Sequence, residues 1–468
     1  MKIEQIYTGC LAQGAYYIES NGEAAIIDPL RETQTYIDKA TANNVHIKYV
    51  FETHFHADFV SGHVDLAKAT GATIVYGPNA TTDYEMYSAT DGEVFTIGDI
   101  QIKVIHTPGH TLESTTYLLI DAQGKEHAIF SGDTLFLGDV GRPDLAIKSD
   151  LTKEDLAGML YDSLREKIMV LPDDLIVYPA HGAGSACGKN LSKETVGILG
   201  EQKQTNYALR ADMTKAEFIE EVLDGIAPPP QYFAKNAMLN KVGYASFETV
   251  LEKGNVALTS ERLETLANEE NALVLDVRNR YEFVAEHIPN SIYIGLDGGF
   301  APWVGALIKD LQQPIVLVVP EGKSEEAITR LSRVGYDNTL GYLEGGIAAW
   351  KASGREIASI ESISAATFEK RLQNNNLNML DVRKDGEYKA KHIEDVQHFA
   401  LDFINKNMNQ IEASKEYYIH CAGGYRSVIA ASILKARGFH NVINVEGGFA
   451  AIKETAIPLT EFVCPSTL

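Results

Sequence analysis

The sequence predicts an α/β protein with one large N-terminal domain followed by two small, related domains. Three observations support this prediction. Short β-rich runs alternate with helical stretches, three consecutive prolines at 228–230 interrupt the alternation, and two later segments of about one hundred residues each resemble one another. The length of 468 residues is also too great for one ordinary hydrophobic core.

Composition and charge restrict the function. The 64 acidic residues against 41 basic ones give a net charge of −23, which disfavours non-specific binding to nucleic acid or to an anionic membrane. The N-terminal residues do not read as a signal peptide, and no segment approaches the ~18 apolar residues of a membrane span. We therefore expect a cytoplasmic protein that binds neither nucleic acid nor membrane. The four cysteines form no CxxC pair, which favours free thiols over structural disulfides.

Residues 1–240 are expected to form the first domain. Its β-rich runs are GEAAIIDP, IKYVFETH, ATIVYG, IQIKVIHTPGH, HAIFSGD and DLIVYPAHG, and most of them end in His, Asp, Gly or Pro. Polar residues at strand ends, on loops above a rigid sheet, are the usual layout of an α/β active site. The domain closes with DGIAPPPQYFAKN, whose prolines cannot continue a helix and predict a linker.

The segment THFHADFVSGH introduces the chemistry of this domain. It carries two histidines and an aspartate in the spacing of a binuclear metallohydrolase, but Phe59 replaces the next histidine of that signature. Further candidates follow in HTPGHT, FSGDTLF and YPAHGAG. Six ligand-type residues at predicted strand ends, in this order, jointly indicate a metal site. They are His54, His56, Asp58, His110, Asp133 and His181.

This pattern resembles the metallo-β-lactamase superfamily, which implies a four-layer αββα sandwich. The motifs PGHT, SGDTLF, GDVGRPD and YPAHGAGSACGK resemble the persulfide dioxygenase branch of that superfamily. The resemblance implies one Fe(II) per chain, held by His54, His110 and Asp133 in a facial triad that leaves three positions open. The residues alone do not decide between Asp133 and His56 as the third ligand, so that choice rests on the resemblance.

Phe59 removes one ligand of the second metal, so the other members of the set are expected to be neighbours of a single metal. We expect His56, Asp58 and His181 to orient a bound ligand or to handle a proton. His63, one helical turn further on, is an alternative ligand, although such positions usually face solvent.

Two more residues have both a functional and a structural interpretation. Arg142, in VGRPD, would bind the anionic end of a thiol persulfide or would form a salt bridge within its loop. Cys187 would relay sulfur from the metal pocket or would fill a small buried space. The run GAGSACGKN does not fit a phosphate-binding loop, because Lys189 is followed by Asn.

The second half of the chain contains an internal duplication, which predicts domains at 255–355 and 360–468. ALVLDVRNRYEFVAEHIPNSIYIGL matches LNMLDVRKDGEYKAKHIEDVQHFAL, and RVGYDNTLGYLEGGIAAW matches ARGFHNVINVEGGFAAI. The βα alternation of both copies predicts parallel sheets. Corresponding residues in the first match are Glu282 and Glu387, and His287 and His392.

Only the second copy carries a candidate nucleophile. Its segment YYIHCAGGYRSVIAASILKARGF runs from a strand through a glycine-containing loop into a helix expected to begin near Ser427. Cys421 stands at the end of the strand, where the loop amides, the helix dipole and Arg426 would favour its thiolate. The alternative is a buried core cysteine. The predicted active-site loop comprises Cys421, Ala422, Gly423, Gly424, Tyr425, Arg426 and Ser427.

This arrangement resembles the rhodanese family of sulfurtransferases, which implies that Cys421 forms a persulfide. The LDVR strand, the His-Ile segment and the EGG sequence are further resemblances, whereas HIEDVQHFAL departs from the Pro-Gly-Ala type sequence usual there. In the first copy, Pro320 aligns with Cys421 and the loop is expected to be shorter. The first copy is therefore expected to be an inactive pseudo-rhodanese, a structural or docking spacer.

Nearly the whole chain thus resembles bacterial fusions of persulfide dioxygenase and sulfurtransferase domains. The resemblance implies that O2 oxidises a small thiol persulfide, of the glutathione or coenzyme A type, to sulfite, and that Cys421 converts sulfite to thiosulfate. Such chemistry would detoxify sulfide, and related fusions suggest a homo-oligomer. Two alternatives stay open. One is a zinc thioesterase of glyoxalase II type with an accessory rhodanese, and the other is a non-catalytic sulfur carrier or sensor.

Overall fold

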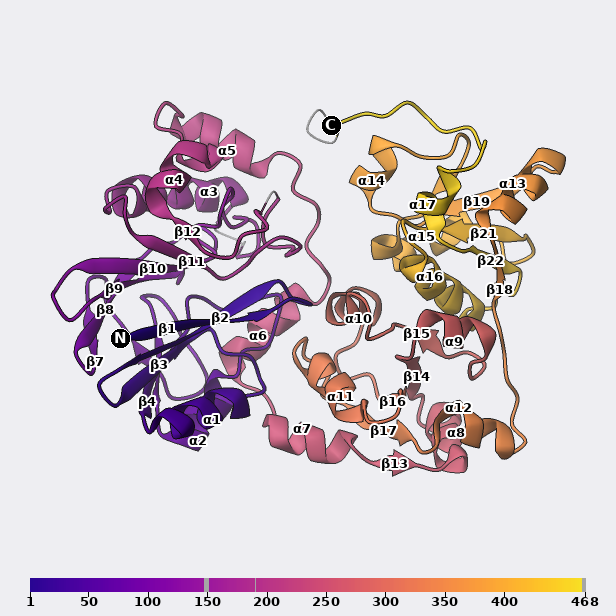
Figure 1. Ribbon diagram of the computed structural model, residues 1–468, viewed down its shortest axis with the longest axis horizontal. Coiled ribbons are helices and arrows are strands. Elements are labelled where there is room, and N and C mark those ends of the chain that lie inside the picture. Colours follow the sequence, from indigo (N-terminus) through magenta and orange to yellow (C-terminus); the bar gives the residue numbers. More distant parts are fainter. Residues whose placement is uncertain (147–150, 190, 465–468) are drawn as a thin grey trace. The chain divides into compact units, whose positions relative to one another are not determined.

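The computed structural model describes residues 1–146, 151–189 and 191–464 (Figure 1). The chain forms two compact units. One consists of Met1–Phe247 with the short segment Ser332–Gly335, and the other of Glu248–Leu331 with Tyr336–Leu468. Within the described residues, no helix is long and apolar enough to cross a membrane.

The first unit is built on two six-stranded sheets, with the orders β1-β2-β3-β4-β5-β6 and β12-β11-β10-β9-β8-β7. The first sheet consists of β1 (Lys2–Thr8), β2 (Gln13–Ser20), β3 (Glu23–Ile27), β4 (His46–Phe51), β5 (Thr73–Tyr76) and β6 (Tyr87–Ser88). The second consists of β7 (Val94–Ile97), β8 (Ile100–His106), β9 (Thr115–Ile120), β10 (Glu126–Gly132), β11 (Ile176–Pro179) and β12 (Gly197–Ile198). All six β-rich runs noted in the sequence are strands.

The two sheets face each other across a hydrophobic core. Strand β8 alternates buried and more exposed side chains along its first half, so that Ile100, Ile102 and Val104 enter this core. Phe51 and Tyr117, from opposite sheets, pack with their ring centroids 4.9 Å apart. Apolar side chains that alternate along the strands therefore hold the two sheets together.

Helices cover the outer faces of both sheets, as Figure 1 shows. Tyr36 and Leu66 pack the first pair of helices on one sheet, and Leu160 and Phe218 pack the next group on the other. The expected four-layer αββα sandwich is confirmed. These helices are α1 (Gln34–Asn43), α2 (His63–Thr70), α3 (Lys153–Ser163), α4 (Leu199–Thr205) and α5 (Lys215–Leu223).

The prolines at 228–230 do not end the first unit. No regular element covers them, but the chain then forms helix α6 (Phe233–Val242), whose Phe233, Asn236 and Asn240 are buried. The predicted linker is therefore wrong for the second half of DGIAPPPQYFAKN. Proline stops a helix that precedes it, yet it does not prevent a new helix from starting a few residues later.

The second unit contains two parallel five-stranded sheets of identical topology. Their orders are β13-β17-β16-β14-β15 and β18-β22-β21-β19-β20, so each strand has a counterpart five strands later. The expected duplication is thus confirmed as two α/β domains of one fold. The first sheet consists of β13 (Ala257–Leu258), β14 (Leu273–Asp276), β15 (Ile292–Tyr293), β16 (Ile315–Val318) and β17 (Thr339–Leu343). The second consists of β18 (Glu361–Ile363), β19 (Asn378–Asp381), β20 (Gln397–His398), β21 (Tyr417–His420) and β22 (Val442–Val445).

Helices accompany the strands of both repeats. Helix α7 (Phe247–Gly254) precedes the first sheet. The first repeat then has α8 (Ser260–Glu269), α9 (Arg280–Ala285), α10 (Phe300–Leu307), α11 (Ser324–Ser332) and α12 (Gly346–Ala352). The second has α13 (Ala365–Asn374), α14 (Asp385–Ala390), α15 (Ile404–Asn407), α16 (Tyr425–Ala436) and α17 (Gly448–Ile452).

The LDVR strands build the same buried ion pair in both repeats. Nη2 of Arg278 donates to Oδ2 of Asp276 at 2.7 Å, and Nη2 of Arg383 donates to Oδ2 of Asp381 at 2.6 Å. In each repeat the same nitrogen also donates to a main-chain carbonyl eight residues later. A buried arginine whose donors are satisfied in this way fixes the turn after the strand.

The two His-Ile segments are also structural. Nδ1 of His287 donates to the carbonyl of Phe283 at 2.7 Å, and Nδ1 of His392 donates to the carbonyl of Tyr388 at the same distance. Each imidazole stacks on the ring of that same residue, with centroids 4.1 and 3.9 Å apart. The matched motifs therefore report a shared scaffold, which both repeats have whether or not they carry a nucleophile.

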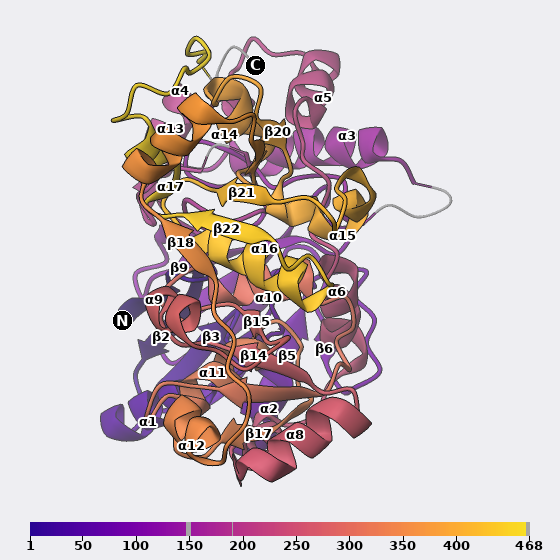
Figure 2. The same cartoon turned by 90° about the vertical axis from the view of Figure 1, so that its right-hand side faces the viewer.

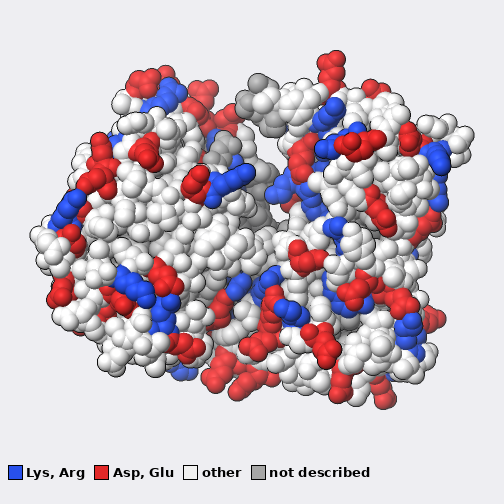
Figure 3. All heavy atoms as spheres, in the orientation of Figure 1, with Lys and Arg blue, Asp and Glu red and all other residues white. Residues whose placement is uncertain are grey.

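Acidic side chains outnumber basic ones over the whole sequence, and the surface reflects this. On the face that Figure 3 shows, Asp and Glu side chains are spread widely with Lys and Arg between them. Among the described residues, charged side chains of both signs are therefore mixed over this face and form no large patch of one sign.

Candidate functional site

Loops at strand ends bring the three predicted metal ligands together in the first unit. His54 follows β4, His110 follows β8 and Asp133 follows β10, and one ligand atom from each lies within 4.8 Å of the others. Nε2 of His110 is 3.3 Å and Nε2 of His54 is 3.9 Å from Oδ2 of Asp133. All three side chains are buried.

Hydrogen bonds set the tautomer of each histidine ligand. Nδ1 of His110 donates to the carbonyl of Arg142 at 2.8 Å. Nδ1 of His54 lies 3.0 Å from Oγ1 of Thr53, which itself donates to Asp28 at 2.8 Å and so is free to accept from the imidazole. Both rings therefore carry their proton on Nδ1 and present a bare Nε2 toward Asp133, as a metal ligand requires.

Burial also keeps His54 neutral. Burial lowers the pKa of His54 well below its ordinary value, and the neighbouring His56, His110 and His181 lower it further. A neutral imidazole is the form that binds metal.

The carboxylate of Asp133 fits a bound cation. Both of its oxygens are buried and lack a hydrogen-bond donor among the described residues, which is costly unless a cation neutralises the charge. Gly141 allows the GDVGRPD loop to pack closely here, since a Cβ on it would lie 2.0 Å from the carbonyl oxygen of Asp133 and 3.0 Å from Nδ1 of His110. A metal held by two imidazoles and this carboxylate would accept lone pairs from the buried oxygens of Asp133, which have no hydrogen-bond donor among the described residues.

A second group of ligand-type atoms adjoins the first. Asp58, His181 and Cys187 also offer atoms within 4.8 Å of one another. Nε2 of His181 lies 3.4 Å from Oδ2 of Asp58 and 3.6 Å from Oδ1 of Asp133, while its Nδ1 donates to the carbonyl of Ala12 at 3.1 Å. His181 therefore points its bare nitrogen toward Asp58 and the predicted ligand Asp133.

Cys187 is a buried residue beside Asp58 and His181. Burial raises the pKa of Cys187 well above its ordinary value, and the carboxylates of Asp58 and Asp133 raise it further. Burial and the two carboxylates thus both favour the thiol over the thiolate.

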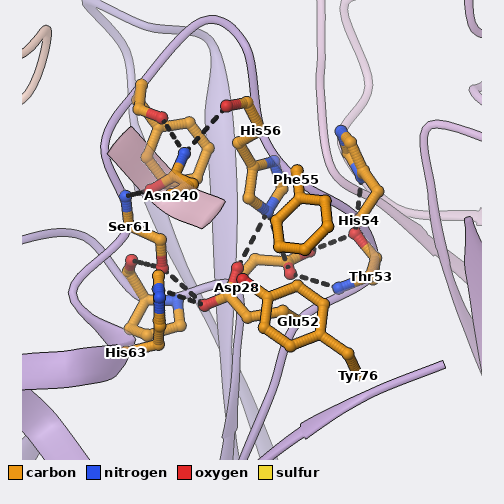
Figure 4. Close-up of polar contacts among 12 residues, drawn as sticks. Asp28, Glu52, Thr53, His54, Phe55, His56, Ser61, His63, Tyr76 and Asn240 are labelled. Carbon is orange, nitrogen blue, oxygen red and sulfur yellow. Dashed lines mark hydrogen bonds and ion pairs between the residues drawn. The ribbon is translucent and has the colours of Figure 1, made fainter. Parts of the chain in front are cut away.

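His56 turns away from the predicted triad. Figure 4 shows its ring directed toward two buried carboxylates, with Nε2 3.0 Å from Oδ1 of Asp28 and 3.4 Å from Oε2 of Glu52. Burial by itself would lower the pKa of His56, but Asp28 and Glu52 outweigh it and raise that pKa well above its ordinary value. His56 thus groups with Asp28 and Glu52, which could themselves hold a cation, while Asp133 groups with His54 and His110. The geometry therefore favours Asp133 over His56 as the third member of the predicted triad.

His63 belongs to the same buried network, not to the metal site. Its Nδ1 lies 3.4 Å from Oε1 of Glu52, and its Nε2 lies 2.7 Å from the hydroxyl of Tyr84. The expectation that this position faces solvent is wrong, because α2 places His63 at its buried first turn. Ser61 donates to Glu52 from the other side.

Helix α6 clamps the loop that carries these histidines. Nδ2 of Asn240 donates to the carbonyls of His56 and Phe59, each at 2.8 Å, and its Oδ1 accepts from the N–H of Ser61 at 2.8 Å. One buried amide thereby satisfies three main-chain groups of the ligand loop.

Phe59 fills the place from which the signature histidine is missing. Its side chain is fully buried, and its ring lies 4.3 Å from the ring of His56. Phe59 therefore packs as an apolar side chain against the ring of His56.

The contacts of Arg142 are those of its structural interpretation, a salt bridge within its loop. Its Nε and Nη2 donate to the two carboxylate oxygens of Asp144 at 2.6 and 2.8 Å, and its other contacts are the carbonyls of Ala186 and Ala227. With its donors occupied, the guanidinium has little capacity left for a substrate anion.

The predicted active-site loop of the second repeat forms as a tight turn around sulfur. Cys421 follows β21, and its Sγ accepts the N–H of Gly424 at 3.1 Å and lies 3.6 Å from Oγ of Ser427. Gly424 has a φ of 98°, which glycine adopts without strain, and it caps α16. The helix begins at Tyr425, two residues before the predicted start, so its N-terminal N–H groups lie next to the sulfur.

Main-chain hydrogen bonds from the residues that follow the EGG sequence hold this loop in place. The N–H of Phe449 donates to the carbonyl of Cys421 at 2.6 Å, and the N–H of Ala450 donates to the carbonyl of Ala422 at 3.0 Å. A Cβ on Gly448 would lie 2.3 Å from the carbonyl oxygen of Cys421. The second glycine of EGG is therefore needed for this close approach.

Arg426 is engaged by a carboxylate of its own repeat. Nη1 and Nη2 donate to the two oxygens of Glu387 at 2.6 and 2.8 Å. This bidentate pair holds the arginine beside the loop and neutralises much of its charge.

In the first repeat the position of Cys421 is taken by Val319, not by Pro320. Val318 and His420 pair with equivalent residues of the neighbouring strand, so the residues after them correspond. Five residues separate β16 from α11, against four between β21 and α16, so the expected shorter loop is also wrong. The alignment by sequence missed a one-residue insertion that strand register reveals.

Sequence reasoning missed Asp28, Glu52, Thr53 and Asn240. Asp28 follows β3 and so shared the strand-end signal that pointed to the ligands. Glu52 and Thr53 directly precede the histidine motif. Asn240 lies 181 residues from Phe59 in the chain, and no local signal connects the two.

Comparison with known families matches both halves of the chain. The metallo-beta-lactamase superfamily matches residues 8–181, and the rhodanese-like domain matches residues 259–353 and 364–455. The two rhodanese-like matches fall on the two repeats of the second unit.

Several relatives are similar to this chain. A solved structure of a metallo-beta-lactamase from Staphylococcus aureus subsp. aureus COL is 32% identical, covers 73% of this chain and 98% of its own, and has a TM-score of 0.66. A probable hydroxyacylglutathione hydrolase of Schizosaccharomyces pombe is 31% identical over 34% of this chain, and a hydroxyacylglutathione hydrolase of Tolumonas auensis is 32% identical over 36%. The chain spans only 58% and 60% of the length of these two hydrolases.

Proposed function

Because this chain belongs to the metallo-beta-lactamase superfamily and continues into two rhodanese-like domains, we propose that it oxidises and transfers persulfide sulfur. In the first step, a small thiol persulfide, O2 and one water would give the thiol, sulfite and two protons at one ferrous ion per chain, with O2 as the oxidant of the outer sulfur. In the second step, Cys421 transfers a sulfane sulfur to sulfite and thiosulfate forms. Both reactants are small molecules, and the net charge of −23 fits a protein that binds no nucleic acid.

The direction of His56 carries the first half of this proposal. Its ion pairs with Asp28 and Glu52, together with Phe59, leave His54, His110 and Asp133 as the ligand set. Ferrous iron bound to two histidines and a carboxylate supplies redox chemistry with O2 that zinc lacks. The protein residues would supply the rest: bare Nε2 atoms as ligands, and His181 with Asp58 to hold the proton of the departing thiol.

The Cys421 loop supports the second half. The outer sulfur of a Cys421 persulfide is attacked by the sulfur lone pair of sulfite, the S–S bond to Sγ breaks, and its electron pair leaves on Sγ as a thiolate. The N–H of Gly424, which already donates to Sγ at 3.1 Å, stabilises that developing negative charge. No external oxidant or reductant is needed for this transfer.

A second candidate is a zinc thioesterase, which the similarity to hydroxyacylglutathione hydrolases favours. Asp58, His181 and Cys187 would then hold a second metal beside the first. This enzyme would cleave an S-acyl glutathione, would not consume O2, and would bind more than one zinc per chain.

The deciding experiment loads the full-length protein with Fe(II) under anaerobic conditions and, separately, with Zn(II). Glutathione persulfide is then added with O2 in an oxygen electrode, and sulfite and thiosulfate are measured. We expect O2 uptake from the iron form alone, and no hydrolysis of S-lactoylglutathione by either form. Absence of O2 uptake by the iron form, or thioesterase activity of the zinc form, would overturn the dioxygenase proposal.

Variants of the ligand set give the matched control. We expect His54→Ala and Asp133→Asn to lower bound iron to less than about a tenth of a mole per mole and to abolish O2 uptake, since each removes a ligand. His46→Gln changes an exposed histidine at the start of β4, the strand that precedes His54. This variant should retain both iron and activity. A chain that loses neither iron nor uptake in the two ligand variants would contradict the assignment.

A further inference from the structure

Arg280 of the first repeat lies beside the active-site loop of the second. It is the first residue of α9, and a Cβ placed on Gly424 would lie 3.9 Å from Cζ of Arg280 and 3.6 Å from the main-chain nitrogen of Gly447. Gly424 is the residue whose N–H donates to Sγ of Cys421. A guanidinium from the repeat without a nucleophile thus stands next to a donor of the transfer site.

Contacts along α16 hold the two repeats in this arrangement. The hydroxyl of Tyr425 donates to the carbonyl of Gly295 at 2.7 Å, and a Cβ on Gly298 would lie 2.4 Å from the Tyr425 ring. Two turns further along α16, Oγ of Ser432 accepts the N–H of Tyr293 at 3.0 Å. Helix α16 lies beside β15 and α9, as both Figure 1 and Figure 2 show. Packing at several points therefore sets the place of Arg280 relative to the loop.

The charge of Arg280 is available to a ligand. Among the described residues no carboxylate lies within ion-pair distance of its guanidinium, which donates to the hydroxyl of Tyr281 at 2.9 Å and lies over that ring. Asp297, the nearby acid, accepts from the side chain of Asn279 instead. Arg280 is only partly buried, so a small anion can reach it.

Two comparisons within the unit make this arginine unusual. Arg426, which the sequence indicated as the cation of the site, is paired with Glu387 through both of its terminal nitrogens. The residue equivalent to Arg280 in the second repeat is Asp385, which pairs with Lys389 on the surface. The shared scaffold therefore does not require an arginine at this position.

We propose that the cysteine-less repeat completes the transfer site, with Arg280 binding the oxygens of an anionic sulfur-oxygen acceptor such as sulfite. This inference rests on the proposed sulfur transfer at Cys421. In that step the persulfide anion and sulfite dianion give the Cys421 thiolate and thiosulfate dianion, so total charge is unchanged while three negative charges meet. A cation that binds the acceptor oxygens lowers this repulsion and leaves the sulfur lone pair free to attack.

The test measures acceptor preference in single turnovers. Full-length protein is loaded with sulfane sulfur on Cys421 and mixed with sulfite or with 2-mercaptoethanol, a neutral thiol acceptor. We expect Arg280→Gln to lower the second-order rate constant for sulfite about tenfold or more, as loss of a charge-assisted contact requires. The rate with 2-mercaptoethanol should change less than about twofold, because no anion is bound.

Two further variants separate binding from packing. Arg280→Lys keeps the positive charge and should recover most of the sulfite rate. Arg262→Gln, which removes an exposed arginine paired with Glu270 on the same repeat, should leave both rates unchanged. An unchanged sulfite rate in Arg280→Gln, or an equal fall with both acceptors, would overturn the role of Arg280. A wild-type chain that transfers sulfur to neither acceptor would instead overturn the proposed function itself, and this inference with it.

Discussion

The two repeats of the second unit have the same sheet order, the same buried Asp–Arg pair and the same stacked histidine, yet only one has a cysteine at the end of its central strand. Val319 occupies that place in the first repeat, and the loop after it is one residue longer. The difference teaches that the motifs shared by the repeats maintain the fold. The chemistry depends on a few loop residues that the fold merely positions.

The repeats also differ in what surrounds the equivalent glutamates. Both glutamates accept the N–H of the residue before their helix, from Asn279 and Lys384, but only Glu387 also holds an arginine, Arg426, beside the transfer loop. The first repeat, which has no cysteine at this place, nevertheless places Arg280, at the start of α9, next to the loop of the second repeat. An inactive copy can contribute to a site without carrying its nucleophile.

The largest expected effect comes from the nucleophile. Cys421→Ser should lower thiosulfate formation at least about a thousandfold, because the proposed persulfide forms on Cys421, and sulfite should accumulate in its place. Val319→Cys in that background should restore nothing, since the first repeat lacks the turn that donates to sulfur. Cys464→Ser is the control and should keep full activity. Thiosulfate formed at the wild-type rate by Cys421→Ser would break the comparison.

Removal of the shared ion pair should affect both repeats alike. Asp276→Asn and Asp381→Asn each leave a buried arginine without its counter-charge, and each should lower the free energy of unfolding by about 3–5 kcal/mol. Asp385→Asn alters an exposed pair and should cost less than about 0.5 kcal/mol. Denaturant titration of the full chain measures all three. A loss in only one repeat would show that the pair has different roles in the two copies.

The smallest expected effect is an acid dependence specific to the first repeat. Burial lowers the pKa of His287 to about 4, so the folded chain binds a proton less readily than the unfolded one. Stability is therefore complete above about pH 6.5 and falls between pH 6.5 and 4, by up to about 3 kcal/mol from this residue. His287→Gln should flatten the fall of Tm over that range relative to wild type and to His46→Gln. Parallel curves for all three chains would contradict this.

Whereas the αββα sandwich came from the family resemblance, local patterns were sufficient to predict the α/β alternation, the duplication and the loops that carry His54, His110, Asp133 and Cys421. These features follow from strand-end residues and from periodicity, both of which a sequence displays directly. The order of the motifs along the chain then matched that of a known family. The family resemblance indicated Asp133 as the third ligand, and in the structure Asp133 lies with His54 and His110.

The remaining features depend on side-chain direction and on distant contacts. Whether His56 faces a metal or a carboxylate depends on Asp28, which approaches it from another strand. Whether Arg426 is free depends on Glu387, which lies 39 residues earlier. The register that places Val319 opposite Cys421 becomes visible only when the strands are paired. Tertiary packing decides each of these, so spacing alone could not.

Asn240 shows where an autonomous catalytic module would have to end. The family match stops at residue 181 and the prolines at 228–230 look like a natural place to divide the gene. A fragment cut there would keep every metal ligand but would leave two carbonyls and one N–H of the ligand loop unpaired. A shorter chain that is meant to keep this candidate metal site intact therefore has to include α6, beyond the prolines.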